Sequence, residues 1–394
     1  MATDNRARRS PHEPSRAIKT AEILIVGGGV IGLSIARELA LRGVRNIVLC
    51  DKGEFGKEAS WAAGGILAPQ VEADRVDNFF RLATASRDLY PTLAQSLADE
   101  TGIDIELNQT GTLYLAFNEY EEAELIRRVA WQQRAGLRVE WLDSPAVRRL
   151  EPNISPEVRC ALRFPDDWQV ENRKLVAALI AANEKHGLTQ MSNCEVTSLR
   201  VERGRVLGIE SVNGGTIAAP NVVVCAGAWT TSVRTTSSAP IEIEPVRGQM
   251  LCFKPTQQIA RHVIYSTNGY LVPRRDGRVL AGSTSEHSGF DKRVTTKGVN
   301  AIQSMAIEIA PTLAGAQLAD SWAGFRPRAA DDLPVIGPDA EIAGLTYATG
   351  HYRNGILLAP ITAQLIADLL AGGRSPISLA DFSPKRLGLI SAGC

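Results

Sequence analysis

The fold of this 394-residue chain is decided by residues 23–32, which read Ile-Leu-Ile-Val-Gly-Gly-Gly-Val-Ile-Gly. The first four residues are all apolar, as in a strand that is buried on both faces of a parallel sheet. The glycines fit the pattern G-x-G-x-x-G, and residues 33–42 then read as an amphipathic helix that ends before Gly43. A second apolar run at 47–50 completes a strand–helix–strand unit. The stretch therefore predicts a Rossmann-type dinucleotide-binding fold.

Each glycine of the predicted turn has its own task. Gly27 permits the tight turn, Gly29 lets the backbone approach a pyrophosphate, and Gly32 allows the helix to pack closely on the strand. The phosphate charge would meet the N–H groups and the positive dipole end of the helix. We therefore expect the backbone of Val30 and Ile31 to contact the cofactor.

Asp51 stands at the end of the second strand, 19 residues after the last glycine of the turn. A carboxylate at this position can accept hydrogen bonds from the hydroxyls of a ribose. Nicotinamide enzymes and flavoproteins share this arrangement. The fingerprint alone predicts a bound dinucleotide and leaves open which one it is.

Composition limits the class of protein. Lys plus Arg and Asp plus Glu both total 43, so the formal net charge is zero and argues against a nucleic-acid partner. No apolar run reaches the roughly 18–20 residues of a membrane-spanning helix. The cysteines form no C-x-x-C pair and the histidines no ligand pair, so no metal site is expected. Four cysteines in apolar runs predict buried thiols in a reducing, cytoplasmic compartment: Cys50, Cys194, Cys225 and Cys252.

The rest of the chain alternates between two patterns. Residues 194–225 read as a meander of short strands, the last of which is a buried strand that ends just before a glycine turn. Residues 241–325 hold short strands and one helix without the alternation of strand and helix that a parallel sheet requires. A buried strand at 345–349 and a helix over about 354–371 return to the first pattern. The predicted fold class is α/β, α+β overall, with two domains interleaved in the sequence.

Three motifs carry a resemblance to a known family. They are residues 60–69 (Ser-Trp-Ala-Ala-Gly-Gly-Ile-Leu-Ala-Pro), 222–229 (Val-Val-Val-Cys-Ala-Gly-Ala-Trp) and 350–360 (Gly-His-Tyr-Arg-Asn-Gly-Ile-Leu-Leu-Ala-Pro). Together they resemble the D-amino-acid oxidase family of flavoproteins, and within it the glycine oxidases of bacterial thiamine biosynthesis. The likeness runs from about residue 21 to 372. It implies an FAD-binding domain with a glutathione-reductase-like Rossmann core beside a substrate domain built on a large mixed sheet.

By this resemblance the FAD-binding domain has three parts in the sequence and the substrate domain has two. The predicted boundaries are a disordered extension at 1–20, FAD-binding parts at 21–105, 161–240 and 326–375, substrate-domain parts at 106–160 and 241–325, and a C-terminal tail at 376–394. Members of the family often form homotetramers, so a homo-oligomer is expected.

The resemblance also implies the contacts of FAD. Asp51 and Lys52 would hold the adenosine ribose, although many relatives carry Glu where this chain has Asp51, and Val196 would offer its backbone to the adenine. Near the pyrophosphate and the flavin would lie Ser60, Ala63, Gly64, Gly65, Ala226 and Gly227. Under the flavin ring would run His351, Tyr352, Arg353, Asn354, Gly355, Ile356 and Leu357. Relatives with covalent flavin carry a cysteine just after the segment of Arg326, and residues 328–332 contain none, so non-covalent FAD is expected.

The candidate substrate site centres on Arg326, which ends an aromatic-rich stretch and precedes a proline. A partly buried arginine needs an anion, and a carboxylate matches its fork through two parallel hydrogen bonds. In the resembling family the matching arginine binds the carboxylate of the amino acid. Tyr270 matches a tyrosine that donates to the same carboxylate, and Arg353 matches a second arginine that adds positive potential.

These residues predict FAD-dependent oxidative deamination of glycine or of other small amino acids such as sarcosine and D-alanine. The Cα–H would pass to the flavin as hydride, and the imine would hydrolyse to a 2-oxo acid and ammonia. Dioxygen would reoxidise the flavin and yield hydrogen peroxide. The resemblance places this reaction in the synthesis of the thiamine thiazole.

Three alternatives are weighed against this prediction. A D-amino-acid dehydrogenase would keep the flavin but pass electrons to a quinone, and residues 333–337 (Leu-Pro-Val-Ile-Gly) fit both classes. A nicotinamide-dependent reductase would need a catalytic acid, which the chain does not display. A non-catalytic dinucleotide-binding protein would tolerate the loss of Arg326.

Overall fold

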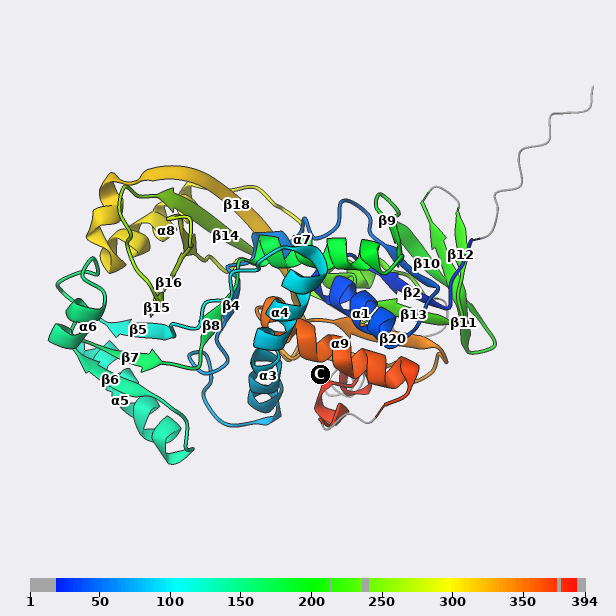
Figure 1. Cartoon of the computed structure of the whole chain (residues 1–394), viewed down its shortest axis with the longest axis horizontal. Helices are drawn as coiled ribbons and strands as arrows, with labels where there is room; N and C mark the ends of the chain where they lie inside the picture. The colour runs from blue at the N-terminus through cyan, green and yellow to red at the C-terminus, as the bar shows by residue number, and fades with distance from the viewer. Residues whose placement is uncertain (1–18, 213–214, 236–240, 374–376, 388–394) are drawn as a thin grey trace, which may run out of the picture.

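The computed structural model describes residues 19–212, 215–235, 241–373 and 377–387, which form two lobes (Figure 1). One lobe is built on a six-stranded sheet of order β19-β20-β13-β2-β3-β9. The other is built on an eight-stranded sheet of order β18-β14-β17-β16-β15-β5-β7-β6. The predicted extension lies outside the described residues up to residue 18, whereas Lys19–Thr20 form the short strand β1 rather than a disordered segment.

The six-stranded sheet is the predicted Rossmann core. Its parallel strands are β20 (Leu345–Thr349), β13 (Asn221–Val224), β2 (Ile23–Val26), β3 (Ile47–Cys50) and β9 (Thr189–Met191), and β19 (Val335–Pro338) is antiparallel to β20 at the edge. In β2, Ile23 and Ile25 lie in the cluster with the helices, and Leu24 and Val26 lie in the cluster on the opposite face. The sheet is therefore covered on both sides, as its uninterrupted apolar runs predicted.

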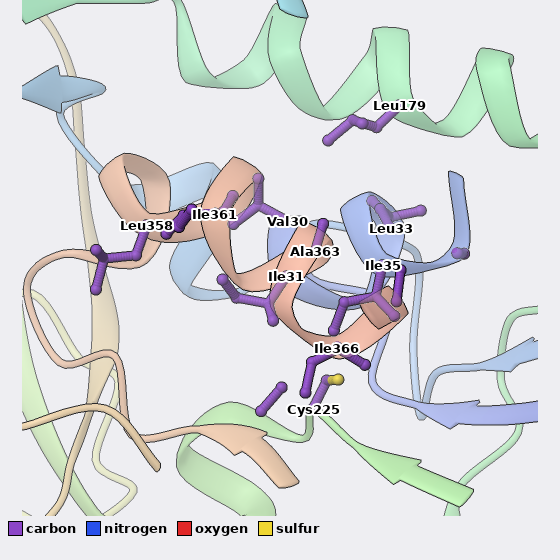
Figure 2. Close-up of a cluster of buried hydrophobic side chains, with 14 of the residues drawn as sticks. Val30, Ile31, Leu33, Ile35, Leu179, Cys225, Leu358, Ile361, Ala363 and Ile366 are labelled. Carbon is purple, nitrogen blue, oxygen red and sulfur yellow. The ribbon is translucent and has the colours of Figure 1, made fainter. Parts of the chain in front are cut away.

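Three helices cover the first face: α1 (Val30–Leu41), α7 (Asn172–Lys185) and α9 (Gly355–Ala371). Figure 2 shows Leu33 of α1, Leu179 of α7 and Ile361 of α9 in this buried cluster. Helix α1 begins at Val30, three residues before the predicted start, because the last glycine of the turn adopts helical geometry. The opposite face packs on a four-stranded sheet of β1, β12 (Thr216–Ala218), β11 (Arg205–Ser211) and β10 (Val196–Glu202).

The eight-stranded sheet is mixed, with one parallel pair between β15 and β5. Its strands are β18 (Gln317–Arg328), β14 (Glu244–Lys254), β17 (Val279–Gly282), β16 (Gly269–Pro273), β15 (Val263–Ser266), β5 (Thr112–Ala116), β7 (Cys160–Phe164) and β6 (Glu140–Asp143). Helix α8 (Thr296–Ile309) packs on one face. The other face packs against residues 62–71 of the first lobe and α5 (Glu119–Arg134). The predicted boundaries at 160 and 325 fall inside β7 and β18.

Short elements connect the lobes and close the chain. They are α2 (Ala59–Ala62), β4 (Ile66–Leu67), α3 (Asn78–Asp88), α4 (Tyr90–Thr101), α6 (Ser144–Leu150), β8 (Trp168–Gln169), η1 (Gly227–Ser232), η2 (Pro311–Gly315) and η3 (Ala380–Phe382). The described part of the predicted tail packs back on the first lobe: Phe382 is buried, and Arg386 pairs with Asp331 at 2.6 Å.

Helix α9 contains Pro360 in its second turn, where proline cannot donate to the carbonyl of Ile356. The hydroxyl of the buried Tyr90 donates to that carbonyl instead, and the hydroxyl of Ser86 donates to the carbonyl of Leu357 at 2.6 Å. Tyr90 of α4 thus satisfies the acceptor that the proline leaves open, and Ser86 of α3 satisfies the next carbonyl along the helix. This support fixes the N-terminal turn of α9.

The five cysteines of the described ranges are buried and free, among them the four predicted to be buried thiols; Cys394 lies outside these ranges. Across the same ranges, no helix has both the length and the apolar content needed to cross a membrane.

Candidate active site

A large cavity opens at the carboxyl ends of β2, β3 and β13 and extends to strands β14, β16 and β18 of the other lobe. Its empty volume is about 1620 Å³, open edge included. Most of the predicted site residues line it: Gly27, Gly29, Val30, Ile31, Asp51, Lys52, Ser60, Ala63, Gly64, Val196, Ala226, Gly227, Tyr270, Arg326, His351, Tyr352, Arg353, Gly355 and Ile356. The structure thus brings together residues from most of the chain.

Four predicted site residues do not line this cavity: Gly32, Gly65, Asn354 and Leu357. A Cβ on Gly32 would lie 2.0 Å from the carbonyl oxygen of Gly27, so this glycine permits close packing inside the turn. Gly65 has φ +72° and would place a Cβ 2.1 Å from the carbonyl oxygen of Val170.

The turn between β2 and α1 has the geometry that a dinucleotide needs. Gly27 has φ +112°, and a Cβ there would lie 2.3 Å from the carbonyl oxygen of Cys225. Gly29 adopts extended backbone immediately before α1 and lies open to the cavity. The amide of Val30 donates to the hydroxyl oxygen of Ser60 at 2.9 Å. The first turn of α1 therefore points its positive dipole end into the cavity, where a phosphate would be stabilised.

Asp51 is held rigidly at the end of β3. Its Oδ2 accepts from the amide of Gly28 at 2.7 Å, and its Oδ1 accepts from the amide of Gly53 at 2.8 Å. Each carboxylate oxygen keeps a lone pair for another donor, as the hydroxyls of a ribose would provide. This arrangement fits the adenosine half of FAD.

Lys52 follows with its Nζ 3.3 Å from the ring centroid of Trp229. Burial lowers the pKa of this ammonium, and the aromatic face offsets part of the cost of burying its charge. The lysine thus extends along the cavity wall beside Asp51, at the end of the site where the adenosine is expected.

The loop at 63–65 is held by Arg274, the residue that follows strand β16 and that is only 7% exposed. Its guanidinium donates to the carbonyl oxygens of Val170 at 2.8 Å and Gly64 at 2.9 Å, and to Oδ1 of Asn172 at 3.0 Å. Asn172 in turn donates to the carbonyl oxygen of Ser60 at 2.8 Å. Burial lowers the pKa of Arg274 to about 10, so it stays charged at neutral pH. The substrate lobe therefore positions a loop of the cofactor lobe.

The N-terminus of α9 forms another wall of the cavity, through Gly355 and Ile356. Its cap residue, Asn354, makes no side-chain hydrogen bond to the helix, so the first amides remain available. The nearby His351 is buried, and its Nε2 lies 3.0 Å from the hydroxyl of Thr362. Burial lowers the pKa of His351 to about 3, so the ring is neutral and adds no charge at this wall.

The far end of the cavity carries the predicted substrate residues. Arg326 donates from Nη1 to the carbonyl oxygen of Thr284 at 3.0 Å and from Nη2 to the hydroxyl of Ser283 at 2.6 Å. The hydroxyl of Tyr270 lies 3.3 Å from the same Ser283 oxygen. Within the described ranges Arg326 has no acidic partner, although it is partly buried. This guanidinium is therefore free to bind an anion.

Arg353, by contrast, is already paired. Its Nη2 donates to Oε1 of Glu72 at 2.9 Å, and the hydroxyl of Tyr265 donates to the same oxygen at 3.1 Å. The charge of Glu72 raises the pKa of Arg353, and burial raises the pKa of Tyr265. The rings of Tyr265 and Tyr270 lie 5.5 Å apart, so this polar cluster adjoins the substrate end.

Sequence reasoning missed Glu72, Tyr265 and Arg274. Glu72 follows the first of the three motifs by three residues, and Arg274 follows Tyr270 by four, so position near a motif was the only available signal. Among the described residues, no group of three or more His, Cys, Asp or Glu side chains is arranged to hold a metal ion.

Comparison with known proteins agrees with this geometry. The family described as FAD dependent oxidoreductase (DAO) matches residues 22–369. The chain is 37% identical over 369 residues to the glycine oxidase of Pseudomonas putida, covering 93% of this chain and 99% of that protein. It is 36% identical to the bifunctional protein ThiO/ThiG of Trichormus variabilis, covering 93% of this chain and 55% of that protein. The crystal structure of glycine oxidase from Geobacillus kaustophilus superposes with a TM-score of 0.89 at 36% identity, covering 93% of this chain and 98% of that chain.

Proposed function

Because this chain belongs to the DAO family of FAD-dependent oxidoreductases and is an FAD-dependent amino-acid oxidase, we propose that its substrates are glycine and other small amino acids, sarcosine and D-alanine included. One observation carries this proposal. The free guanidinium of Arg326 and the hydroxyl of Tyr270 line one end of the same cavity whose other end fits the adenosine of FAD. The similarity to glycine oxidases supports a small substrate.

Arg326 and Tyr270 would bind the carboxylate of the amino acid. The guanidinium fork can form two parallel hydrogen bonds to a carboxylate, and the tyrosine hydroxyl can add a third. A carboxylate fixed in this way orients Cα toward the part of the cavity lined by Gly64 and the N-terminus of α9. The small residues Gly64 and Ala63 leave room for a substrate with a short side chain.

FAD, when bound, supplies the two-electron acceptor for oxidation at Cα. The first amides of α9 would stabilise negative charge at that wall of the cavity. The reaction requires the neutral amine of the substrate, because the nitrogen lone pair that assists loss of hydride from Cα is missing in the ammonium form. The rate should therefore rise with pH until the substrate amine is fully neutral.

The overall reaction converts glycine or D-alanine, dioxygen and water into a 2-oxo acid, ammonia and hydrogen peroxide. With sarcosine, a secondary amine, methylamine would leave in place of ammonia. Dioxygen as the acceptor is part of the proposal, as are non-covalent attachment of FAD, a homo-oligomer, a cytoplasmic location and a role in thiamine thiazole synthesis. Similarity to a ThiO/ThiG protein supports the last of these.

The test is anaerobic mixing of the purified holoenzyme with glycine, sarcosine and D-alanine, followed by admission of air. The expected result is bleaching of the flavin's visible band, rapid recovery in air, and one hydrogen peroxide for each 2-oxo acid. Bleaching that air reverses only slowly, but a quinone reverses quickly, would instead identify the dehydrogenase. Failure of all three amino acids to bleach the flavin would contradict the proposed substrate class.

A further inference from the structure

The two arginines of the substrate end differ in whether their charge is available. Among the described residues, the hydrogen-bond partners of Arg326 are neutral, a hydroxyl and a carbonyl oxygen, whereas Arg353 donates to the carboxylate of Glu72 at 2.9 Å. Glu72 does not line the cavity, but Arg353 does. Any anion that reaches Arg353 from the cavity must share its guanidinium with Glu72.

Glu72 is held in place by the turn that carries it. The buried carboxylate of Asp167 accepts from the amides of Gln70 at 3.0 Å and Val71 at 2.7 Å, just before Glu72. Arg128 donates to the carbonyl oxygens of Val71 at 2.6 Å and Ala73 at 3.1 Å, on either side of Glu72. The backbone on either side of Glu72 is therefore held by the side chains of Asp167 and Arg128, and the carboxylate itself is held by Arg353 and Tyr265.

The net charge at the substrate end of the cavity is the sum of the charges of its two arginines and Glu72. Arg326, Arg353 and Glu72 together contribute one positive charge, and His351 is neutral. One substrate carboxylate balances that charge. A second anionic group that reached Arg353 would meet Glu72, whose carboxylate lies 2.9 Å from that guanidinium and would repel it.

We propose that Glu72 is a specificity-determining residue that restricts this site to amino acids with a single anionic group and excludes dicarboxylic amines. This inference rests on the proposed function, because it assumes that Arg326 binds the first carboxylate. It extends the proposed function by naming a class of amino acids, the dicarboxylic amines, that the same site excludes. Glu72 acts through Arg353 and need not touch the substrate.

The test uses two unreactive ligands of the same shape that differ by one charge, diglycolate and its monoamide. Their dissociation constants are measured on the holoenzyme from the change that they cause in the visible spectrum of the bound flavin. We expect the wild-type enzyme to bind the monoamide at least about tenfold more tightly than diglycolate, since one close pair of like charges opposes the diacid.

The variant Glu72→Gln keeps an oxygen that can accept from Arg353 and Tyr265 but removes the charge. It should reduce the preference for the monoamide by at least about tenfold, whereas Glu72→Asp should keep it. Asp74→Asn is the matched control, because Asp74 carries the same charge in the same turn, is 90% exposed and contacts Arg128 rather than Arg353. It should leave the preference unchanged.

Equal binding of the two ligands by the wild-type enzyme, or a change of less than about threefold in Glu72→Gln, would overturn this inference. If Glu72→Gln fails to retain flavin, Arg353→Met decides, because it leaves the charge of Glu72 without a partner and should strengthen the preference for the monoamide; an unchanged preference overturns the inference. If glycine, sarcosine and D-alanine also fail to bleach the wild-type flavin, the proposed function fails first. Bleaching with an unchanged preference refutes the role of Glu72 alone.

Discussion

Replacement of Arg274 by methionine should loosen FAD, although Arg274 does not line the cofactor cavity. Its guanidinium joins three acceptors that belong to the other lobe, the carbonyl oxygens of Gly64 and Val170 and the side chain of Asn172, at 2.8–3.0 Å. Methionine would fill a similar volume but donate to none of them. The acceptors would then be buried without a partner unless the loop at 63–65 moved.

The size of the effect follows from the number of acceptors. A buried acceptor that loses its donor costs about 1–3 kcal/mol, so three acceptors give about 3 kcal/mol at the low end of that range. If about half of this loss is relieved by displacement of the loop that faces FAD, the affinity for FAD falls by about tenfold, since 1.4 kcal/mol corresponds to a factor of ten. The rest should appear as lower thermal stability.

The assay is the dissociation constant of FAD, measured from the fluorescence of flavin released on dilution, together with thermal unfolding of the holoenzyme. Arg275→Met is the matched control, because Arg275 is the next residue, is 60% exposed and pairs with the exposed Asp104. An exposed pair of this kind contributes about 0–1 kcal/mol. If Arg274→Met binds FAD as tightly as Arg275→Met does, the reasoning from buried acceptors is wrong.

Three further predictions concern single side chains. Arg326→Met should lower kcat/KM for glycine by about 10²–10⁴, because two charge-assisted bonds of about 1.5–3 kcal/mol each are lost; Arg328→Met, two residues along and paired with Glu244 and Asp332, is the control for steady-state kinetics. Tyr90→Phe should lower the free energy of unfolding by about 1–3 kcal/mol, since the carbonyl of Ile356 loses its donor, and denaturant titration of the holoenzyme measures this. Burial lowers the pKa of His351 to about 3 in the folded state. At a pH between 3 and 6.5 the unfolded state therefore binds a proton on this ring and the folded state does not. As the pH is lowered from 6.5 to 3, the free energy of unfolding should therefore fall by about 1.4 kcal/mol per pH unit because of this residue. In His351→Gln the free energy of unfolding should depend less steeply on pH over the same range.

The sequence predicted elements best where a local pattern decides the structure. The strands β2, β3 and β20 were predicted with their observed bounds, because an apolar run of four or five residues between glycine turns has few other ways to be buried. The start of α1 was predicted three residues late. The glycine pattern was interpreted as a loop, but its last glycine lies inside the helix and packs on the turn.

Contacts between distant segments could not be predicted in the same way. Arg274 lies 210 residues from Gly64 in sequence, and Arg353 lies 281 residues from Glu72. Whether an arginine at the site is free or paired depends on such contacts. The sequence gives Arg326 and Arg353 the same charge, and only the structure separates the arginine that can bind a carboxylate from the one that already has a partner.

The availability of Arg326 depends in turn on a residue without a side chain. Gly248 of β14 lies opposite Gly324 of β18, and a Cβ on Gly248 would fall 2.4 Å from the guanidinium of Arg326. A Cβ on Gly324 would fall 2.5 Å from the Cβ of Ala62, on the segment that faces the cofactor. Glycine usually weakens a strand interior, and it is retained where another group must approach closely. This facing pair lets the same stretch of sheet admit Arg326, the arginine that we propose binds the substrate carboxylate, and the segment at residue 62 side by side.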